Sequence, residues 1–389
     1  MPLVISEKDN AWNARHASGR CGGPRQIEVN GTAILKDLKC AIDGQSDDML
    51  HCKKAHLFHK AGQTIFQCDG TFKGGQTYAQ SCRYAGNSVR ITWDLNWPKD
   101  TPVTSSVEIG SAVLPGEWRQ VYAINAEPVP GLPYPGLWKT LTPGEILFFD
   151  KLPASLVFER NDGVRLEYSL GFDLWRWNYG LGVEGASTLT VQVGMDGITL
   201  TRRVAQTQAE EGVLPEAREY RFMAIISWSW PGMKPLAEIS EAQELPLLDN
   251  NQGFDMRQFK NAPVCLDYAK LPCIEGAMRA GYEASSKAPC LETSQAISLL
   301  KRCVRQLSET GKEGTLVIRN LEPGFCNAGN HVSKKGDRLH WDLYDILTFA
   351  SWAKNCLGEG WLLACPQNTW HDLPSLAGLH LPNGYVAEE

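Results

Sequence analysis

The chain has 389 residues, of which 43% are hydrophobic and 21% are charged, and it carries a formal net charge of -6 at pH 7. These values are typical of a folded globular protein and exclude a disordered one, and the length suits two or three domains. The acidic balance argues against nucleic acid as a partner, because phosphate backbones select a basic face. No run of about 18 apolar residues occurs, so no membrane-spanning helix is expected.

The 12 cysteines are widely spaced, and none belongs to a C-x-x-C pair. A secreted disulfide scaffold is short and dense in cysteine, and this chain is neither, so we expect mostly free thiols in a reducing cytoplasm. The first ten residues also lack the basic segment and apolar run of a secretory signal. A cytoplasmic location is therefore expected, and a homo-oligomer stays open.

Residues 1–232 carry the pattern of many short strands. The dipeptide Asn30-Gly31 tolerates the positive φ angles of a tight turn and predicts a hairpin between 26–29 and 32–35. Along 89–97 apolar and polar residues alternate, which places the apolar set on one buried face of a strand. Further strands are expected at 106–113, 118–124, 156–160, 164–170, 189–193, 198–204 and 221–230. The fold class is therefore mainly β, with 1–232 forming a large antiparallel β-sandwich.

The remaining chain predicts a linker and a smaller α/β part. Residues 233–290 hold five scattered prolines and show no clear period, so we expect an irregular linker packed on the sheet. Within 291–389 the pattern becomes helical at 296–307 and again at 343–353, with apolar strands at 315–319 and 360–365. This order of helices and strands predicts two parallel strands with a covering helix.

The segment 172–179 gathers aromatic side chains, a carboxylate, a guanidinium and an amide within eight residues. As a strand it would place Asp173, Trp175 and Trp177 on one face, with Arg176 and Asn178 on the other. An indole ring takes the apolar face of a sugar while polar neighbours bond its hydroxyls, so the pattern predicts a sugar subsite. A core strand with a satisfied Arg–Asp pair is the alternative.

Other aromatic residues differ in what they predict. The proline-rich stretch 127–144 is expected to be a long, stiff loop, and Tyr134 and Trp138 within it are candidates for the rim of a site. The Trp-containing stretches 93–97 and 228–230 fit the core of a sheet better, because their alternation matches a half-buried strand.

Histidines provide a second set of candidate catalytic residues. His331 and His371 follow the two predicted parallel strands and would lie near their carboxyl ends, where open α/β layers bind ligands. A neutral His beside a carboxylate can act as a general base, whereas helix capping or a surface position is the alternative. The spacing of His51, His56 and His59 does not suit zinc on a strand, so no metal is predicted. No nucleotide-binding or hydrolase motif occurs, and no cofactor is predicted.

In strand number and in its Trp-rich strands, 89–97 and 173–177, the β part resembles the β-supersandwich of galactose-mutarotase-like proteins and of many polysaccharide-acting enzymes. That family uses a His and a Glu on this scaffold, and the histidines of 1–232 match no position of its pattern. The stretch 291–371 loosely resembles the last α/β units of polysaccharide-deacetylase-like barrels, with Glu322-Pro323 where that family often carries His-Pro. The resemblance implies a carbohydrate ligand.

These features predict a glycan-processing enzyme, either a glycoside hydrolase or a polysaccharide lyase. The predicted catalytic residues are Asp173, Arg176, Glu159, His331 and His371. The predicted substrate-binding residues are Trp175, Trp177, Asn178, Tyr134 and Trp138.

The two enzyme classes need different groups. A hydrolase needs two carboxylates about 5–10 Å apart, for which Asp173, Glu159, Asp94 and Glu167 are available. A lyase would use Arg176 to neutralise a uronate. The alternative to both is a non-catalytic carbohydrate-binding or assembly subunit that presents a Trp-rich sheet face.

Overall fold

The structure of the chain is a computed structural model. It describes residues 3–7, 11–52, 54–60, 63–99, 104–124, 138–150, 152–153, 155–170, 187–206, 219–231, 243–244, 247–249, 253–254, 264–267, 279–280, 294–310, 314–319, 325–326, 340–341, 349, 352–353, 356–357, 361–364, 374 and 385–388. The chain divides into two compact units. Unit 1 comprises Met1–Tyr84, Ser88–Trp230 and Gly384–Glu389, and unit 2 comprises Ala85–Asn87 and Pro231–Asn383.

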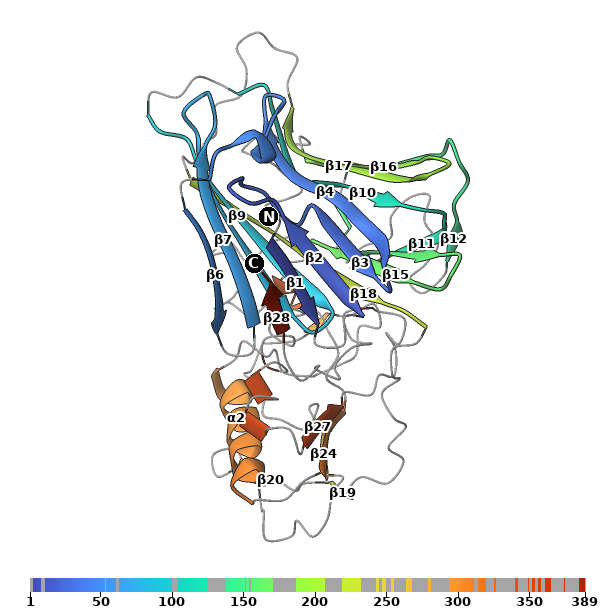
Figure 1. The fold of residues 1–389 in the computed structure, drawn as a ribbon. Coiled ribbons are helices and arrows are strands. Elements are labelled where there is room, and N and C mark those ends of the chain that lie inside the picture. Colours follow the sequence, from blue (N-terminus) through green and yellow to red (C-terminus); the bar gives the residue numbers. More distant parts are fainter. Residues whose placement is uncertain are drawn as a thin grey trace. The chain divides into compact units, whose positions relative to one another are not determined.

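Unit 1 consists of two large antiparallel sheets (Figure 1). Over the described residues, the ten-stranded sheet runs in the order β13 (Ile146–Phe149), β16 (Thr188–Val193), β17 (Gly197–Gln206), β10 (Ser106–Pro115), β4 (Thr32–Ile42), β3 (Gln26–Val29), β2 (Trp12–His16), β1 (Leu3–Glu7) and β28 (Tyr385–Glu388), and β5 (Gln45–Ser46) pairs with β4. The short 3-10 helix η1 (Asp47–Met49) follows β5.

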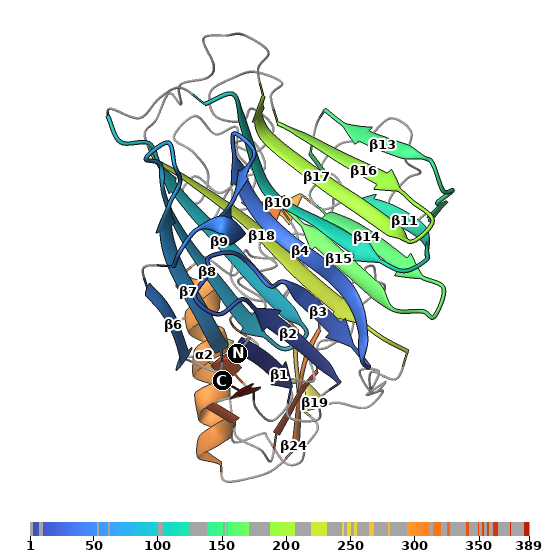
Figure 2. The same cartoon turned by 45° about the horizontal axis from the view of Figure 1, so that its top comes forward.

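The second sheet of unit 1 has nine strands within the described part of the chain. Its order is β12 (Lys139–Thr140), β11 (Trp118–Ile124), β14 (Ser155–Arg160), β15 (Arg165–Ser169), β18 (Glu219–Ser229), β9 (Ser88–Asn96), β8 (Thr77–Ala85), β7 (Gln63–Thr71) and β6 (Lys54–Lys60). Figure 2 shows the two sheets as stacked layers. The predicted fold class, a large antiparallel β-sandwich, is confirmed.

Large aromatic side chains fill the space between the two sheets. The Trp12 ring on β2 lies 4.9 Å from the Trp228 ring on β18, in an edge-on arrangement. Tyr168 on β15 donates a hydrogen bond to the Gly110 carbonyl on β10, at 3.0 Å. Burial of such rings provides most of the driving force for closing the sandwich. The stretches 93–97 and 228–230 were expected in the core, and Trp93, Trp97 and Trp228 are fully buried.

The turns and strand pairings predicted from local sequence patterns are largely present in the structure. Asn30 and Gly31 have φ angles of 49° and 75° and connect β3 to β4. The pairing of β14 with β15 across 161–163 has Glu159 opposite Arg165. In the expected loop 127–144, Lys139 and Thr140 instead form β12, because they pair with Val121 and Gln120 on β11.

Unit 2 contains a parallel sheet and a helix. The four strands described run in the order β19 (Gln243–Glu244), β22 (Val264–Asp267), β24 (Gly314–Arg319) and β27 (Trp361–Ala364), and every pairing is parallel. The helix α2 (Ser294–Glu309) buries Leu299, Leu300, Cys303, Val304 and Leu307. The pairing of β24 with β27 confirms the two predicted parallel strands. The described residues of unit 2 also form short antiparallel pairings: β20 (Leu247–Asp249) with β21 (Gly253–Phe254), and β25 (Phe325–Cys326) with β23 (Arg279–Ala280) and β26 (His340–Trp341).

The stretch 233–290 differs from the expected irregular linker. It contributes β19 and β22 to the parallel sheet and belongs to unit 2. The strands are only two and four residues long, and prolines separate them, so their periodicity is too short to detect in the sequence. Among the described residues, no helix is both long and apolar enough to cross a lipid bilayer.

Candidate functional site

The two faces of the nine-stranded sheet differ in chemistry. One face, with Leu166, Tyr168 and Trp228, packs into the core of the sandwich. The opposite face, here called the polar face, carries mostly polar and charged side chains. The register places on it Gln120, Ser155, Glu159, Arg165, Glu167, Ser169, Ser227, Ser88, Arg90, Thr92, Asp94 and Arg221. Directly paired residues of antiparallel strands point to the same side, so these side chains form one continuous layer, most of which is buried.

Several side chains of the polar face are buried and bonded to one another. The hydroxyls of Ser88 and Ser227 lie 2.7 Å apart, on neighbouring strands β9 and β18. Ser155 donates a hydrogen bond of 3.1 Å to Oε1 of Glu167, and both residues are fully buried. Burying a polar group costs free energy unless it forms hydrogen bonds, and these buried side chains form them with one another.

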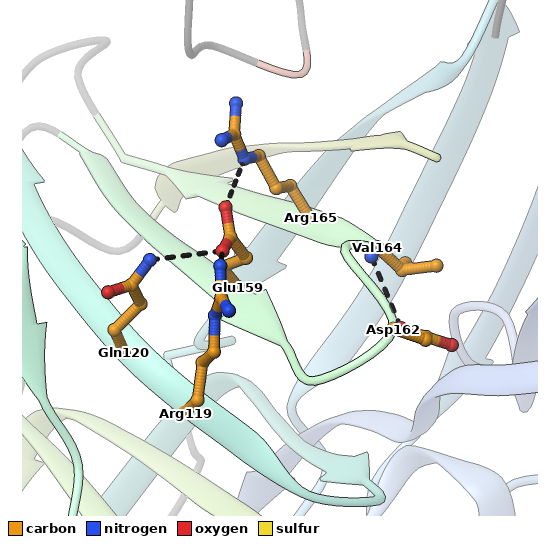
Figure 3. A network of polar contacts seen from close by, with 6 residues as sticks. All are labelled: Arg119, Gln120, Glu159, Asp162, Val164 and Arg165. Carbon is orange, nitrogen blue, oxygen red and sulfur yellow. Dashed lines mark hydrogen bonds and ion pairs between the residues drawn. The ribbon is translucent and has the colours of Figure 1, made fainter. Parts of the chain in front are cut away.

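Glu159 lies at the centre of the most charged part of the polar face (Figure 3). Its side chain is 3% exposed. Arg165 donates from Nε to Oε2 at 2.6 Å, and Gln120 donates to Oε1 at 3.0 Å. Arg119 also donates to Oε1. We call Arg119, Gln120, Glu159 and Arg165 the Glu159 cluster.

A bulge in β11 explains how two consecutive residues reach the same carboxylate. The register of β11 against β14 shifts between Trp118 and Gln120. In a regular strand Arg119 and Gln120 would point to opposite faces, whereas a bulge redirects a side chain. Arg119 thereby joins Gln120 at Glu159, although its side chain remains 51% exposed.

The predicted substrate-binding residue Trp138 lies beside this cluster. The guanidinium carbon of Arg165 is 5.4 Å from the centre of the Trp138 ring, within the range of a cation–π contact. The Tyr122 ring meets the same indole edge-on at 4.6 Å. The structure thus brings Glu159 and Trp138 together through Arg165, and Trp138 is half-buried.

The register also orders the candidate carboxylates. Glu167 lies two residues after Arg165 on β15, so it is the diagonal neighbour of Glu159, and diagonal neighbours are about 7–8 Å apart. Asp94 lies on the same face but six residues along β9 from Ser88, which pairs through Ser227 with Glu167. Six residues of strand span about 20 Å, so Asp94 is too distant to act together with Glu159. Asp94 instead pairs with the exposed Arg221, at 2.6 Å.

The remaining predicted site residues lie outside the described residues: Tyr134, Asp173, Trp175, Arg176, Trp177, Asn178, His331 and His371. Sequence analysis missed Arg119, Gln120 and Arg165. A signal for Arg165 was available, because the predicted hairpin across 161–163 already places Glu159 opposite Arg165. The bulge that recruits Arg119 has no comparable signature in the sequence.

A second group of buried polar side chains lies between the two sheets. The hydroxyl of Tyr78 donates to Oδ2 of Asp47 at 2.8 Å, and Asp47 is fully buried. Burial raises the pKa of Asp47 from 3.8 to about 6, although the bond from Tyr78 opposes the shift. His16 lies 2.7 Å from the hydroxyl of Tyr84, and burial lowers its pKa from 6.5 to about 3.

Metal ligation finds no support in the described part of the chain. Among those residues, no three His, Cys, Asp or Glu side chains converge in a way that could hold a metal ion. His56 and His59 occupy β6, an edge strand, and His59 lies 3.0 Å from the hydroxyl of Thr64.

Comparison with known proteins gives no family. No family model matches the chain, and no curated protein matches its sequence. Solved structures with which it shares a distant likeness include a putative aldose 1-epimerase from Escherichia coli K12, at 9% identity and a TM-score of 0.35, covering 59% of this chain and 99% of that one.

Two glycosidases are also among the structural neighbours. The α-N-acetylgalactosaminidase NagBb from Bifidobacterium bifidum has 8% identity and a TM-score of 0.38, with 94% of this chain and 58% of that one covered. An α-galactosidase from Lactobacillus brevis has 8% identity and a TM-score of 0.37, with 98% and 71% covered. These neighbours are carbohydrate-related enzymes, and at such scores their likeness adds no argument about the site of this chain.

Proposed function

We propose that this chain is a glycan-processing enzyme, a glycoside hydrolase or a polysaccharide lyase, that holds its carbohydrate on the polar face. The observation that carries the proposal is the convergence of Glu159, Glu167 and Trp138 on one sheet face. Glu159 and Glu167 are diagonal neighbours on paired strands, with residue positions about 7–8 Å apart, and this spacing is compatible with the carboxylate separations of about 5–10 Å that glycosidases use. A Trp beside them offers the apolar surface that a sugar ring packs against.

The two carboxyl groups have different surroundings. Glu159 accepts hydrogen bonds from two guanidinium groups and an amide, of which the guanidinium bonds are of the strong, charge-assisted kind. Glu167 is fully buried, and Ser155 donates a hydrogen bond to it. In a hydrolase, one of the two carboxyl groups would protonate the leaving oxygen while the other acts as base or nucleophile.

The lyase alternative uses the same surface differently. A lyase must neutralise the carboxylate of a uronate, and Arg119 and Arg165 provide the guanidinium groups that the sequence analysis sought in Arg176. A non-catalytic carbohydrate-binding subunit would use the same contacts and release no product. The proposed location is the cytoplasm, and the eight cysteines whose side chains the structure describes are free thiols.

Product analysis tests the proposal. The full chain is incubated with a panel of neutral and acidic polysaccharides, and products are identified by mass spectrometry. We expect shortened oligosaccharides, carrying an unsaturated end if the enzyme is a lyase. Glu167→Gln should reduce turnover by about 10²–10⁴-fold, the usual contribution of a general acid.

The control is Glu108→Gln, a carboxylate on the other sheet that pairs with Arg203 at 3.7 Å. It should leave turnover unchanged. Binding without any product would support the non-catalytic alternative, whereas neither binding nor product would contradict a carbohydrate function.

A further inference from the structure

Three cysteine side chains of unit 1 meet, although they come from separate parts of the sequence. Side-chain hydrogen bonds connect the thiol of Cys21 to the thiols of Cys68 and Cys52. The Cys21 thiol also donates a hydrogen bond to the carbonyl of Asp69 on β7, at 3.3 Å. All three cysteines are thiols rather than disulfides in this structure. We call Cys21, Cys52 and Cys68 the thiol cluster.

The backbone brings Cys21 and Cys52 to the same side of a short antiparallel contact. Arg20 forms an isolated bridge with His51, and two backbone hydrogen bonds of 3.2 and 3.3 Å flank this bridge, one donated by each cysteine. Successive side chains of extended chain point to opposite sides, so Cys21 and Cys52 share the side that faces away from Arg20 and His51. This shared side explains why the two thiols meet.

The strand β7 holds Cys21 against Cys68. A Cβ atom at Gly70 would lie 2.9 Å from the Cys21 sulfur, so only glycine leaves room for the sulfur at this position. Cys68 and Gly70 are two residues apart on β7 and therefore face the same side. The Cys21 sulfur thus lies beside Cys68 in a space that Gly70 provides.

The three thiols differ in how easily a soluble oxidant reaches them. Cys21 and Cys68 are 1% and 3% exposed, whereas Cys52 is half-buried. In the sequence, Cys52 is followed directly by Lys53 and Lys54. Reactive cysteines are typically partly exposed and close to basic groups, because the thiolate is the nucleophile. Cys52 is therefore the member of the cluster that meets an oxidant first.

The Cys21 thiol suits the second step of an oxidation. Its hydrogen bond with Cys68, together with burial, raises the pKa of Cys21 above that of an ordinary thiol, so Cys21 keeps its proton at neutral pH. Cys21 therefore does not compete with Cys52 for the oxidant. It lies beside the Cys52 sulfur and has a proton to give to a leaving hydroxyl group.

We propose that Cys52 and Cys21 form a peroxide-sensitive thiol pair. The Cys52 thiolate attacks one oxygen of hydrogen peroxide and the O–O bond breaks. Cys52 becomes a sulfenic acid, and the departing hydroxide takes up the proton that the Cys52 thiol released and leaves as water. The Cys21 sulfur then bonds to the Cys52 sulfur while the S–O bond breaks, and the hydroxyl group leaves with the Cys21 proton as a second water.

The two steps together oxidise two thiols to one disulfide and reduce one peroxide to two waters. In a reducing compartment, such as the one proposed for this chain, a disulfide of this kind is transient and senses the oxidant. The disulfide would join the two segments that the bridge between Arg20 and His51 already holds together.

Disulfide mapping after peroxide treatment tests the proposal. The reduced full chain is treated with hydrogen peroxide, the remaining thiols are blocked with iodoacetamide, and the peptides are identified by mass spectrometry. We expect one pair of peptides joined through Cys21 and Cys52, which separates on treatment with dithiothreitol. A chain without this link, a link between Cys21 and Cys68 instead, or a dimer joined through Cys52 on a non-reducing gel would each overturn the proposal.

The variant Cys52→Ser tests the entry point. It should slow the loss of the Cys21 thiol to peroxide at least tenfold, because Cys21 then has no oxidised partner to attack. Its matched control is Cys356→Ser, which removes a half-buried thiol of unit 2 and should leave the link between Cys21 and Cys52 unchanged. Thermal melting shows that both variants are folded. If Cys21 is oxidised as fast in Cys52→Ser as in the wild type, the proposed first step is wrong.

The variant Cys21→Ser separates the two steps. Without the second thiol, Cys52 should remain a sulfenic acid, which dimedone labels, and the labelling should exceed that of the wild type at least tenfold. Equal labelling of the two proteins would mean that Cys21 does not attack the oxidised sulfur, and the proposed second step would be wrong. Because Cys21 is buried, the half-buried position of Cys52 provides the test that does not depend on a change in the core.

Discussion

The polar face and the inter-sheet core of unit 1 each bury a carboxylate, Glu159 in the first and Asp47 in the second, and they accommodate it by opposite means. Glu159 receives two guanidinium groups and an amide, so its charge is compensated by cations that reach solvent. Asp47 receives the neutral hydroxyl of Tyr78, and burial raises its pKa to about 6. A protein therefore accommodates a buried acid either by placing cations beside its carboxylate or by raising its pKa, so that the neutral form persists to higher pH.

This difference matters for function. A carboxylate between exposed arginines can attract and orient a ligand from solvent. Asp47 lies between the two sheets, where its titration makes folding depend on pH.

The largest expected effect follows removal of Glu159. Glu159→Ala leaves Arg119, Gln120 and Arg165 without their shared acceptor. Each hydrogen bond to a charged group contributes about 1.5–3 kcal/mol, so the loss of unfolding free energy should be at least about 3 kcal/mol. Urea unfolding at pH 7 measures the loss. Asp94→Ala is the control, because its pair with Arg221 is largely exposed, and it should cost less than about 1 kcal/mol. Similar losses for the two variants would contradict the central role of Glu159.

Asp47→Asn should change how stability depends on pH. Because the folded pKa is raised, the folded chain keeps a proton between pH 3.8 and about 6 that the unfolded chain releases. The resulting stability is complete at low pH and is lost as pH rises, at about 1.4 kcal/mol per pH unit and about 3 kcal/mol in all. Relative to wild type, the variant should therefore gain about 3 kcal/mol between pH 4 and 7. A constant difference between the two unfolding curves would rule out this titration.

His16→Gln should show the reverse slope. The folded pKa of His16 is lowered to about 3, so below pH 6.5 His16 binds a proton in the unfolded chain but stays neutral in the folded chain. This contribution is present above pH 6.5 and is lost as pH falls, again at about 1.4 kcal/mol per pH unit. Between pH 4 and 6 in the wild type, the rise of unfolding free energy with pH due to His16 cancels the fall due to Asp47. Relative to wild type, the variant should lose about 3 kcal/mol over that interval as pH rises, in the same urea experiment.

The smallest expected effect concerns Trp138. If the half-buried ring mainly supports Arg165, Trp138→Ala should cost about 1 kcal/mol of stability, the size of a partly exposed cation–π contact. Glycan binding should fall more than stability does. A loss of about 3–5 kcal/mol, measured by thermal melting with urea unfolding, would instead mark Trp138 as a core residue.

Much of unit 1 could be predicted from local sequence patterns. The Asn30-Gly31 turn, the buried face of 89–97 and the hairpin across 161–163 depend on neighbouring residues only, through φ preference and the two-residue period of a strand. The parallel strands at 315–319 and 360–365 were found for the same reason. The strands β19 and β22 were missed because two to four residues are too few to show a period.

The candidate site was predictable only in part. Glu159 and Trp138 were recognised by residue type, and Arg165 follows from the hairpin register. Arg119 and Gln120 reach Glu159 from β11, about 40 residues earlier in the chain, and no local pattern encodes that approach. Asp94 seemed equivalent to Glu167 in the sequence, yet the order of β15, β18 and β9 separates them.

The sequence by itself thus determined that this chain forms short antiparallel strands, where their turns fall, and which residues of each strand share a face, because these properties depend on interactions between near neighbours. The tertiary structure alone decided which strands lie side by side and where a bulge interrupts them. Those two choices gather Arg119, Gln120, Glu159 and Arg165 into one cluster beside Trp138 and move Asp94 away from it. They arise from long-range pairing, whose free energy depends on the whole sheet rather than on any single segment.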